Sequence, residues 1–142
     1  MTIPIYVGFD QREACVFHVF NQSVIQHATQ PVAFHPLSTK MLDFDGQQDG
    51  TNAFIFSRYL VPHLQNYKGW AIFADGDMHV NDDIVKLWEL RDDKYAVMVV
   101  KHDYKTCSKR KYIGSPIEND NINYDRKNWS SRSCSMNVFR GS

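Results

Sequence analysis

Cysteine is scarce in this chain, and the three that are present, Cys15, Cys107 and Cys134, are widely spaced. No two of them form a C-x-x-C motif, so the sequence predicts neither a disulfide framework nor a cysteine-based zinc site. A reducing compartment fits this cysteine usage best. We therefore expect a cytoplasmic protein.

Long apolar runs and an excess of one charge are also missing. No segment approaches the ~18 consecutive apolar residues of a transmembrane helix, and the first ten residues do not resemble a secretory signal. We expect neither membrane insertion nor secretion. The 16 basic and 16 acidic residues cancel, so no long-range field favours nucleic acid as a partner. The basic cluster at residues 105–111 is most simply a solvated loop.

What the sequence does contain is the apolar content of one domain, with 43% hydrophobic residues in a chain of 142. Short apolar runs that end in turns alternate with amphipathic segments. This alternation predicts an α/β fold with a mainly parallel central sheet and flanking helices. Strands are expected within residues 3–10, 31–37, 69–75 and 94–103, and helices within residues 13–27, 53–64 and 82–90.

Local signals refine this pattern at two places. Asn81 or Asp82 is the expected N-cap of the third helix, with Asp83 in its first turn. From residue 106 onward the chain is rich in Asn and Ser and shows no clear periodicity. We expect one domain over residues 1–142, made of a core at 1–105 and an irregular, partly disordered tail at 106–142.

A pair of carboxylates follows the most apolar of the expected strands. Residues 70–74 are almost wholly apolar, and Asp75 and Asp77 then flank Gly76. Alternate residues of an extended segment point the same way, so both carboxylates would face one point above the sheet, and Gly76 would allow a tight turn. Two hard oxygen ligands suit Mg²⁺ or Mn²⁺ shared with a diphosphate. An acidic turn, with Asp75 as a cap and Asp77 solvated, explains the same residues.

The order of these segments resembles the nucleotide-sugar glycosyltransferases of the GT-A fold, and is similar to family 8 and related bacterial and phage enzymes. The resemblance covers residues 3–131 and lies in "IYVGFD", "GTNAFIFSRYLVPHL", "WAIFADGDMHV", "YAVMVVKHDY" and "RKNWSS". It implies a Rossmann-like nucleotide-diphospho-sugar transferase fold. It also implies a metal-dependent transferase that uses a nucleoside-diphosphate sugar, with Mn²⁺ or Mg²⁺ on Asp75 and Asp77 and the diphosphate beside Asp75 and Gly76.

The same resemblance implies further contacts to the donor. Gly8, Phe9 and Asp10 match the turn that holds the base and ribose, and Arg58 in "FSRYL" matches an arginine that contacts the donor. Asn128 resembles an asparagine that touches the transferred sugar. The residues alone leave Asp10 open as a strand cap and Arg58 open as a surface residue. They assign no nucleophile or base.

The chain departs from the family pattern after "NWSS". Relatives continue there with an apolar strand, a late histidine that completes the metal shell, and groups that line the acceptor site, whereas "RSCSMNVFRGS" follows here. We therefore expect a fold that is incomplete at the C-terminus. An unpaired sheet edge would then favour a homo-oligomer. His79, two residues past Asp77, would reach the metal only if this segment stays extended.

Two other functions remain open at this point. A truncated nucleotide-sugar-binding domain with weak or no activity would need the same donor residues. A haloacid-dehalogenase-type phosphatase also ends an apolar strand with Asp-x-Asp, but its motif lies near the N-terminus, and here the motif begins at residue 75. The nucleotide, the sugar, the stereochemical course and the acceptor, whether saccharide, lipid-linked sugar or protein, cannot be read from these residues.

Overall fold

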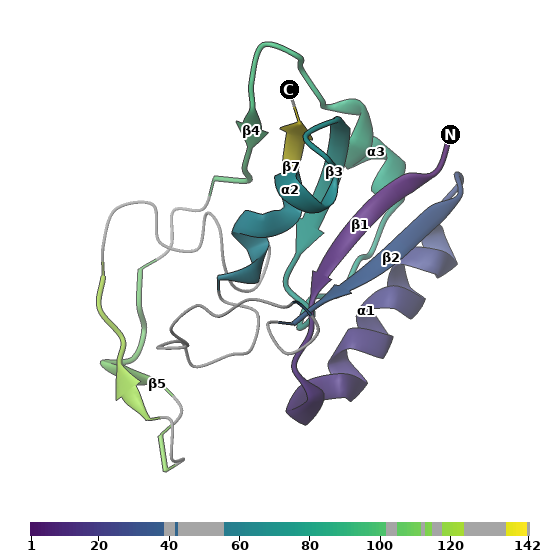
Figure 1. Ribbon diagram of the computed structural model, residues 1–142. Helices are drawn as coiled ribbons and strands as arrows, with labels where there is room; N and C mark the ends of the chain where they lie inside the picture. Colours follow the sequence, from purple (N-terminus) through teal and green to yellow (C-terminus); the bar gives the residue numbers. More distant parts are fainter. Residues whose placement is uncertain are drawn as a thin grey trace.

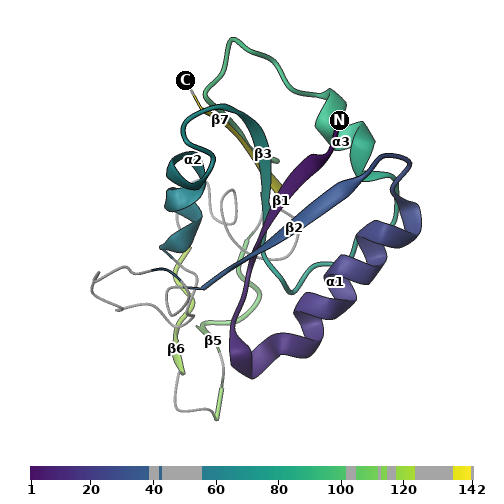
Figure 2. The ribbon, with the colours of Figure 1, turned by 45° about the vertical axis from the view of Figure 1, so that its right-hand side comes forward.

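The protein forms a five-stranded sheet with helices on both faces, and a small two-stranded hairpin stands away from it (Figures 1 and 2). The computed structural model describes residues 1–38, 42, 56–101, 105–111, 113, 114, 118–123 and 136–141. No helix in these ranges is long and apolar enough to cross a membrane.

The centre of the sheet is parallel. β1 (Ile3–Gly8) lies between β2 (Val32–Leu37) and β3 (Gly69–Ala74) and runs parallel to both. β7 (Met136–Gly141) pairs antiparallel with β3 on one side and with the short edge strand β4 (Val97–Met98) on the other. The strand order is β2-β1-β3-β7-β4. These parallel strands and their flanking helices confirm the expected α/β fold.

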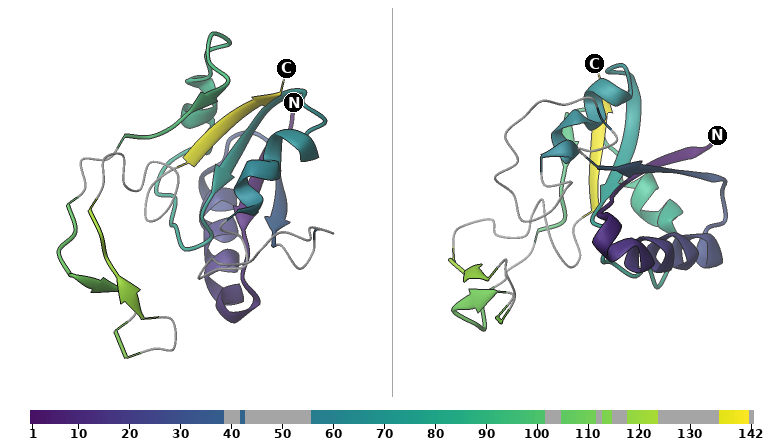
Figure 3. Two further views of the ribbon diagram at one scale, coloured as in Figure 1. Left: turned by 60° about the vertical axis from the view of Figure 1, so that its left-hand side comes forward. Right: turned by 60° about the horizontal axis from the view of Figure 1, so that its bottom comes forward.

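Different helices cover the two faces of this sheet (Figure 3). α1 (Ala14–His27) and α3 (Ile84–Glu89) pack on one face, and α2 (Val61–Leu64) with the preceding 3₁₀ helix η2 (Ser57–Leu60) packs on the other. Successive residues of a strand point to opposite faces, so β1 contributes to both cores, as a central strand must. The first core includes Ile3, Ile5, Val7, Phe20 and Ile84, and the second includes Tyr6, Leu37, Val61, Ala71 and Phe73.

The expectation of an irregular tail was wrong for the described part of residues 106–142. β5 (Arg110–Lys111) and β6 (Asn119–Asp120) form the separate hairpin, and β7 enters the middle of the main sheet. β7 pairs with β3 along its whole length, from Met136 opposite Ala74 to Gly141 opposite Gly69. The sheet edge that we expected to be unpaired beside β3 is therefore filled, which removes that argument for a homo-oligomer.

Two shorter predictions also need correction. Of the strand expected within residues 94–103, the described part, residues 94–101, forms a strand at Val97–Met98, where the chain runs beside β7, and residues 102 and 103 lie outside the described ranges. The N-cap of α3 is Asp83, not Asn81 or Asp82: its carboxylate accepts a hydrogen bond from the Val85 backbone N–H at 3.0 Å. The helix expected at 53–64 is present over its described part as η2 and α2, and residues 53–55 lie outside the described ranges.

The two ends of the parallel strands have different surroundings. Gly141 pairs with Gly69, the first residue of β3, and both termini lie at this end of the sheet in Figure 1. The carboxyl ends of β1, β2 and β3 lie at the opposite end. In α/β sheets, ligands bind outside the carboxyl ends of the strands, so this edge is where a functional site is expected.

Candidate functional site

Two short segments that the sequence singled out meet at the carboxyl edge of the sheet. One follows β1 and the other follows β3, and because these strands are parallel neighbours, the segments emerge side by side. A small hollow lies between them and the start of α1. Its lining consists of Gly8, Asp10, Glu13, Val16, Phe17, Gly76 and Asp77. Four of the residues predicted to bind the donor or the metal, Gly8, Asp10, Gly76 and Asp77, therefore line the same depression.

Gly76 allows the two segments to approach this closely. A Cβ atom built on Gly76 would lie 2.5 Å from the carbonyl oxygen of Gly8, closer than real Cβ atoms come to backbone. Among the described glycines, Gly69 and Gly114 have a positive φ and Gly76 does not. The tight turn that we expected is therefore not what requires glycine here. The requirement comes from close packing against the end of β1.

Asp75 is buried in an ion pair. Its side chain is 3% exposed, and its Oδ1 accepts a hydrogen bond from Nη2 of Arg58 at 3.1 Å, whose side chain is 5% exposed. The Arg58 guanidinium also lies 5.0 Å from the ring centroid of Phe73, two residues before Asp75. A buried carboxylate would be strongly unfavourable without such a partner. The pair thus links η2, on one face of the sheet, to the end of β3.

Asp77 differs from Asp75 in its environment. Asp77 and His79 are exposed, whereas Met78 and Val80 are buried, so the segment after Gly76 alternates as an extended chain does. Asp77 is thus the carboxylate of the motif that solvent, or a cation, reaches directly. The described residues hold no cluster of three or more His, Cys, Asp or Glu side chains arranged for a metal ion.

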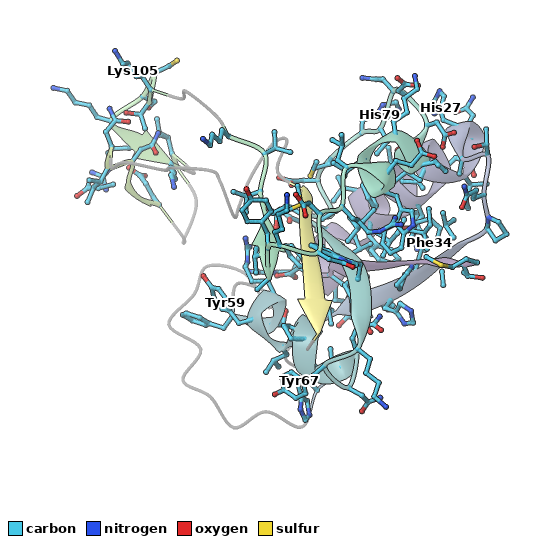
Figure 4. The ribbon with its side chains drawn as sticks, turned by 90° about the horizontal axis from the view of Figure 1, so that it is seen from above. His27, Phe34, Tyr59, Tyr67, His79 and Lys105 are labelled. Carbon is cyan, nitrogen blue, oxygen red and sulfur yellow. The ribbon has the colours of Figure 1, made fainter. Side chains whose placement is uncertain are left out.

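His79 is held by a neighbour in the segment that follows it. A ring nitrogen, Nδ1, lies 2.9 Å from Oδ1 of Asn81. In Figure 4, His79 and His27 both lie on the α1 and α3 side of the sheet, and Tyr59 and Tyr67 lie on the α2 side. The exposed ring of His79 is therefore held by the segment that leads into α3.

Asp10 is held by a neighbour that the sequence analysis did not single out. Its Oδ1 accepts hydrogen bonds from the backbone N–H and the Nε of Arg12, at 3.0 and 2.9 Å, and its Oδ2 accepts from Nη2 of Arg12 at 2.6 Å. Asp10 is also the N-cap of the 3₁₀ helix η1 (Gln11–Glu13). The hydrogen bond and the charge of Asp10 raise the pKa of the Arg12 guanidinium above its ordinary value. Asp10 therefore caps a helix, where the sequence had left open a strand cap, and it also forms a forked ion pair.

Phe9 and Asn128 complete the set of predicted donor residues. The ring of Phe9 packs edge-on against Phe17 of α1, with centroids 5.2 Å apart, and its backbone N–H donates to the carbonyl of Leu37 at 2.7 Å. Phe9 thus joins β2 to α1 beside the hollow. Asn128 lies outside the described residues.

Comparisons with known proteins show the family to which the chain belongs. Residues 4–138 match the model of the family described as glycosyl transferase family 8. A curated relative, Protein CDI of Arabidopsis thaliana, is 40% identical over 134 residues, which cover 89% of this chain and 50% of that protein. The chain therefore spans about half the length of this relative. No solved structure matches the chain. By the extent of the family match, the chain belongs to glycosyltransferase family 8.

Proposed function

We propose that this chain binds a nucleoside-diphosphate sugar together with Mn²⁺ or Mg²⁺ and transfers the sugar to an acceptor. Membership of glycosyltransferase family 8 supports the class of reaction. The structural observation that carries the proposal is the hollow at the carboxyl edge, which Asp10, Gly76 and Asp77 line together. Ligands of α/β sheets bind at this edge.

Asp77 and Asp75 are the proposed metal ligands. Mg²⁺ and Mn²⁺ are commonly bound through one or two carboxylates, with water and substrate phosphates in the remaining positions. An exposed Asp77 next to a buried Asp75 that pairs with Arg58 fits this requirement without a third protein ligand. When bound, the cation would supply positive charge for the diphosphate as it leaves. In the proposal, Arg58 holds Asp75 in place and lies close to the diphosphate.

The nucleoside is proposed to lie on the β1 side of the hollow. Gly8, Phe9 and Asp10 follow β1 there, and Asp10 offers a carboxylate to hydroxyl or N–H groups of the ligand. Asn128 remains a predicted contact of the transferred sugar. The cytoplasmic location and the lack of a nucleic-acid partner likewise remain predictions from composition. A phosphatase finds no support, since the family match is to glycosyltransferases.

Donor binding without turnover is the second candidate function. It is favoured by one observation: the described residues that line the hollow fit donor binding, and none of them is assigned as a nucleophile or base. The two candidates share the same donor site and differ in whether the sugar is released. Incubation of the protein with a radiolabelled sugar nucleotide and Mn²⁺ separates them. A transferase yields transfer or slow hydrolysis of the donor, and a binding domain yields neither.

The proposed metal role is tested by calorimetry with UDP, GDP, CDP and ADP, each with and without Mn²⁺. We expect one of them to bind in an Mn²⁺-dependent manner, and Asp77→Ala to weaken that binding at least about tenfold, because a direct ligand is lost. Asp82→Ala is the matched control. It removes another exposed carboxylate, one that pairs with Lys86 on α3. Failure of the wild-type protein to bind any of the four nucleotides would refute the proposal.

A further inference from the structure

The ion pair between Asp10 and Arg12 is unequal in its exposure. The Asp10 side chain is 6% exposed, whereas that of Arg12 is 61% exposed. In another local pair, Asp82 with Lys86, both side chains are exposed, at 68% and 70%. Ion pairs in which both side chains are exposed, such as Asp82 with Lys86, contribute little to stability. In the first pair, a nearly buried carboxylate depends on an arginine that lies at the surface.

The geometry of the pair fixes the carboxylate in one orientation. Arg12 donates through Nε and Nη2 to the two different oxygens of Asp10, and its backbone N–H adds a third hydrogen bond. A forked arginine–carboxylate contact of this kind is directional as well as strong. Lysine, which is a point charge on a flexible stem, cannot reproduce it. Arg12 therefore fixes the orientation of the Asp10 carboxylate.

This fixed carboxylate lies at the candidate site. Asp10 lines the hollow with Gly76 and Asp77, whereas Arg12 is not part of the lining. A carboxylate has about four lone-pair sites, so an oxygen that accepts from Arg12 can also accept from a ligand. The charged side chains of the lining, Asp10, Glu13 and Asp77, are all acidic. Without a cation they favour hydrogen-bond donors over phosphate.

We propose that Arg12 is a positioning residue for the nucleoside part of the donor, and that it acts through Asp10. The inference rests on the proposed function. Arg12 keeps the Asp10 carboxylate oriented, so that Asp10 accepts hydrogen bonds from ribose hydroxyl or base N–H groups. The diphosphate is held elsewhere, by the cation on the β3 side of the hollow. Nucleoside recognition and diphosphate recognition are thus carried by different strands.

The first test measures two ligands that each carry one half of the nucleotide. Calorimetry is performed with the parent nucleoside of whichever nucleotide binds best, and separately with inorganic pyrophosphate and Mn²⁺. We expect Arg12→Gln to weaken nucleoside binding about tenfold, within the range seen for coupled neighbours. Binding of Mn²⁺-pyrophosphate should stay unchanged. Arg12→Lys should recover only part of the loss, and Lys86→Gln, which breaks an exposed pair, should have no effect.

The second test asks whether Arg12 acts through Asp10. Asp10→Asn and the double variant Asp10→Asn with Arg12→Gln complete a double-mutant cycle. If the inference is right, Arg12→Gln has little further effect on nucleoside binding once Asp10 is changed. Thermal unfolding of each variant shows whether the fold is intact. If Arg12→Gln unfolds, Arg12→Lys, which retains the charge, replaces it in the cycle.

The outcomes separate the inference from the function on which it rests. Unchanged nucleoside binding in Arg12→Gln would overturn the inference and leave the donor site standing. Weaker pyrophosphate binding, or additive effects in the cycle, would also overturn it, because Arg12 would then touch the ligand directly. Absence of nucleotide binding by the wild type would overturn the proposed function, and the inference with it.

Discussion

At the scale of single residues, the site depends on a position where no side chain fits. A Cβ on Gly76 would meet the carbonyl oxygen of Gly8 at 2.5 Å, and backbone cannot move aside as a flexible side chain can. The ends of β1 and β3 can therefore approach this closely because residue 76 has no side chain. The hollow exists in its observed form because these two ends are in contact.

Gly76→Ala should consequently affect both stability and binding. We expect a loss of about 1–3 kcal/mol in the free energy of unfolding, as for other overpacked sites, measured by urea denaturation. Nucleotide binding should weaken as well, since Asp77 moves away from the β1 side. Gly114→Ala is the control: no atom lies within 4 Å of its added Cβ, although its φ of +79° makes alanine strained. Equal binding by Gly76→Ala and the wild type would contradict this account.

The sequence predicted part of this residue-scale arrangement. The sequence predicted one site for the residues that follow the two strands, because the carboxyl ends of adjacent parallel strands share one edge. These residues are Gly8, Asp10, Gly76 and Asp77. The difference between Asp75 and Asp77 could not be foreseen. It depends on Arg58, 17 positions earlier, folding under the end of β3 from the other face of the sheet. Arg12 was missed although it lies two positions after Asp10, because a single arginine in a turn carries no sequence pattern.

At the scale of secondary-structure elements, Asp83 connects two helices that pack on the same face. Its carboxylate caps α3 through Val85, and it also accepts hydrogen bonds from the backbone N–H and the hydroxyl of Thr29, just after α1. The hydrogen bond from Thr29 is the largest cause that lowers the pKa of Asp83, followed by that from Val85. The start of α3 is thus fixed to the end of α1.

Asp83→Ala should lower the melting temperature by a few degrees at neutral pH, since an N-cap and an interhelix link are lost together. The difference in melting temperature between the wild type and Asp83→Ala should shrink as the pH falls. The folded-state pKa of Asp83 is lowered, so its stabilisation is complete above the ordinary value of about 3.9. It is lost as the pH falls through the lowered folded value. Melting curves of the wild type and the variant should converge in that acidic range and differ above it.

Asp82→Ala serves as the control for this prediction. Asp82 is the adjacent carboxylate, just before the cap, and it forms an exposed pair with Lys86 of α3. Its carboxylate accepts hydrogen bonds from the Lys86 ammonium and from the Asp83 backbone N–H, both of them local, so its removal should change the melting temperature less than Asp83→Ala does. A larger effect of Asp82→Ala would show that the link to Thr29 is unimportant.

Periodicity predicted some elements well and others poorly. α1 was expected within residues 13–27 and is observed at Ala14–His27, because its apolar residues recur at helical spacing and pack on one side. β7 was missed, since "MNVFRG" is short and half polar. Its partners, β3 and β4, lie far away in the sequence. The local sequence pattern indicates which residues can face a core. It does not indicate which strands, distant in the sequence, will pair.

At the scale of the whole molecule, the sheet of five strands joins the two halves of the described chain. β1, β2 and β3 lie within the first 74 residues, whereas β7 comes from the last described residues and separates β3 from β4. The α/β class was therefore predictable from the first hundred residues. The completed sheet was not, because the position of β7 depends on the tertiary fold.

The place of β7 in the sheet can be tested through its backbone. Val138 pairs with Ile72 of β3 on one side and with Met98 of β4 on the other. Proline has no N–H and is not tolerated in a central strand. In contrast, β2 carries Pro36 at the outer edge of the same sheet. Val138→Pro should therefore destabilise the fold by about 3 kcal/mol or more in urea denaturation.

Val138→Ala keeps the N–H and provides the control for the loss of the side chain alone. Hydrogen exchange gives an independent measurement: the central amides of β7 should exchange as slowly as those of β3, because both strands open only when the sheet does. Rapid exchange at residues 137–140, together with a harmless Val138→Pro, would place this segment outside the sheet. The edge of β3 would then be unpaired after all, and the argument for self-association through that edge would return.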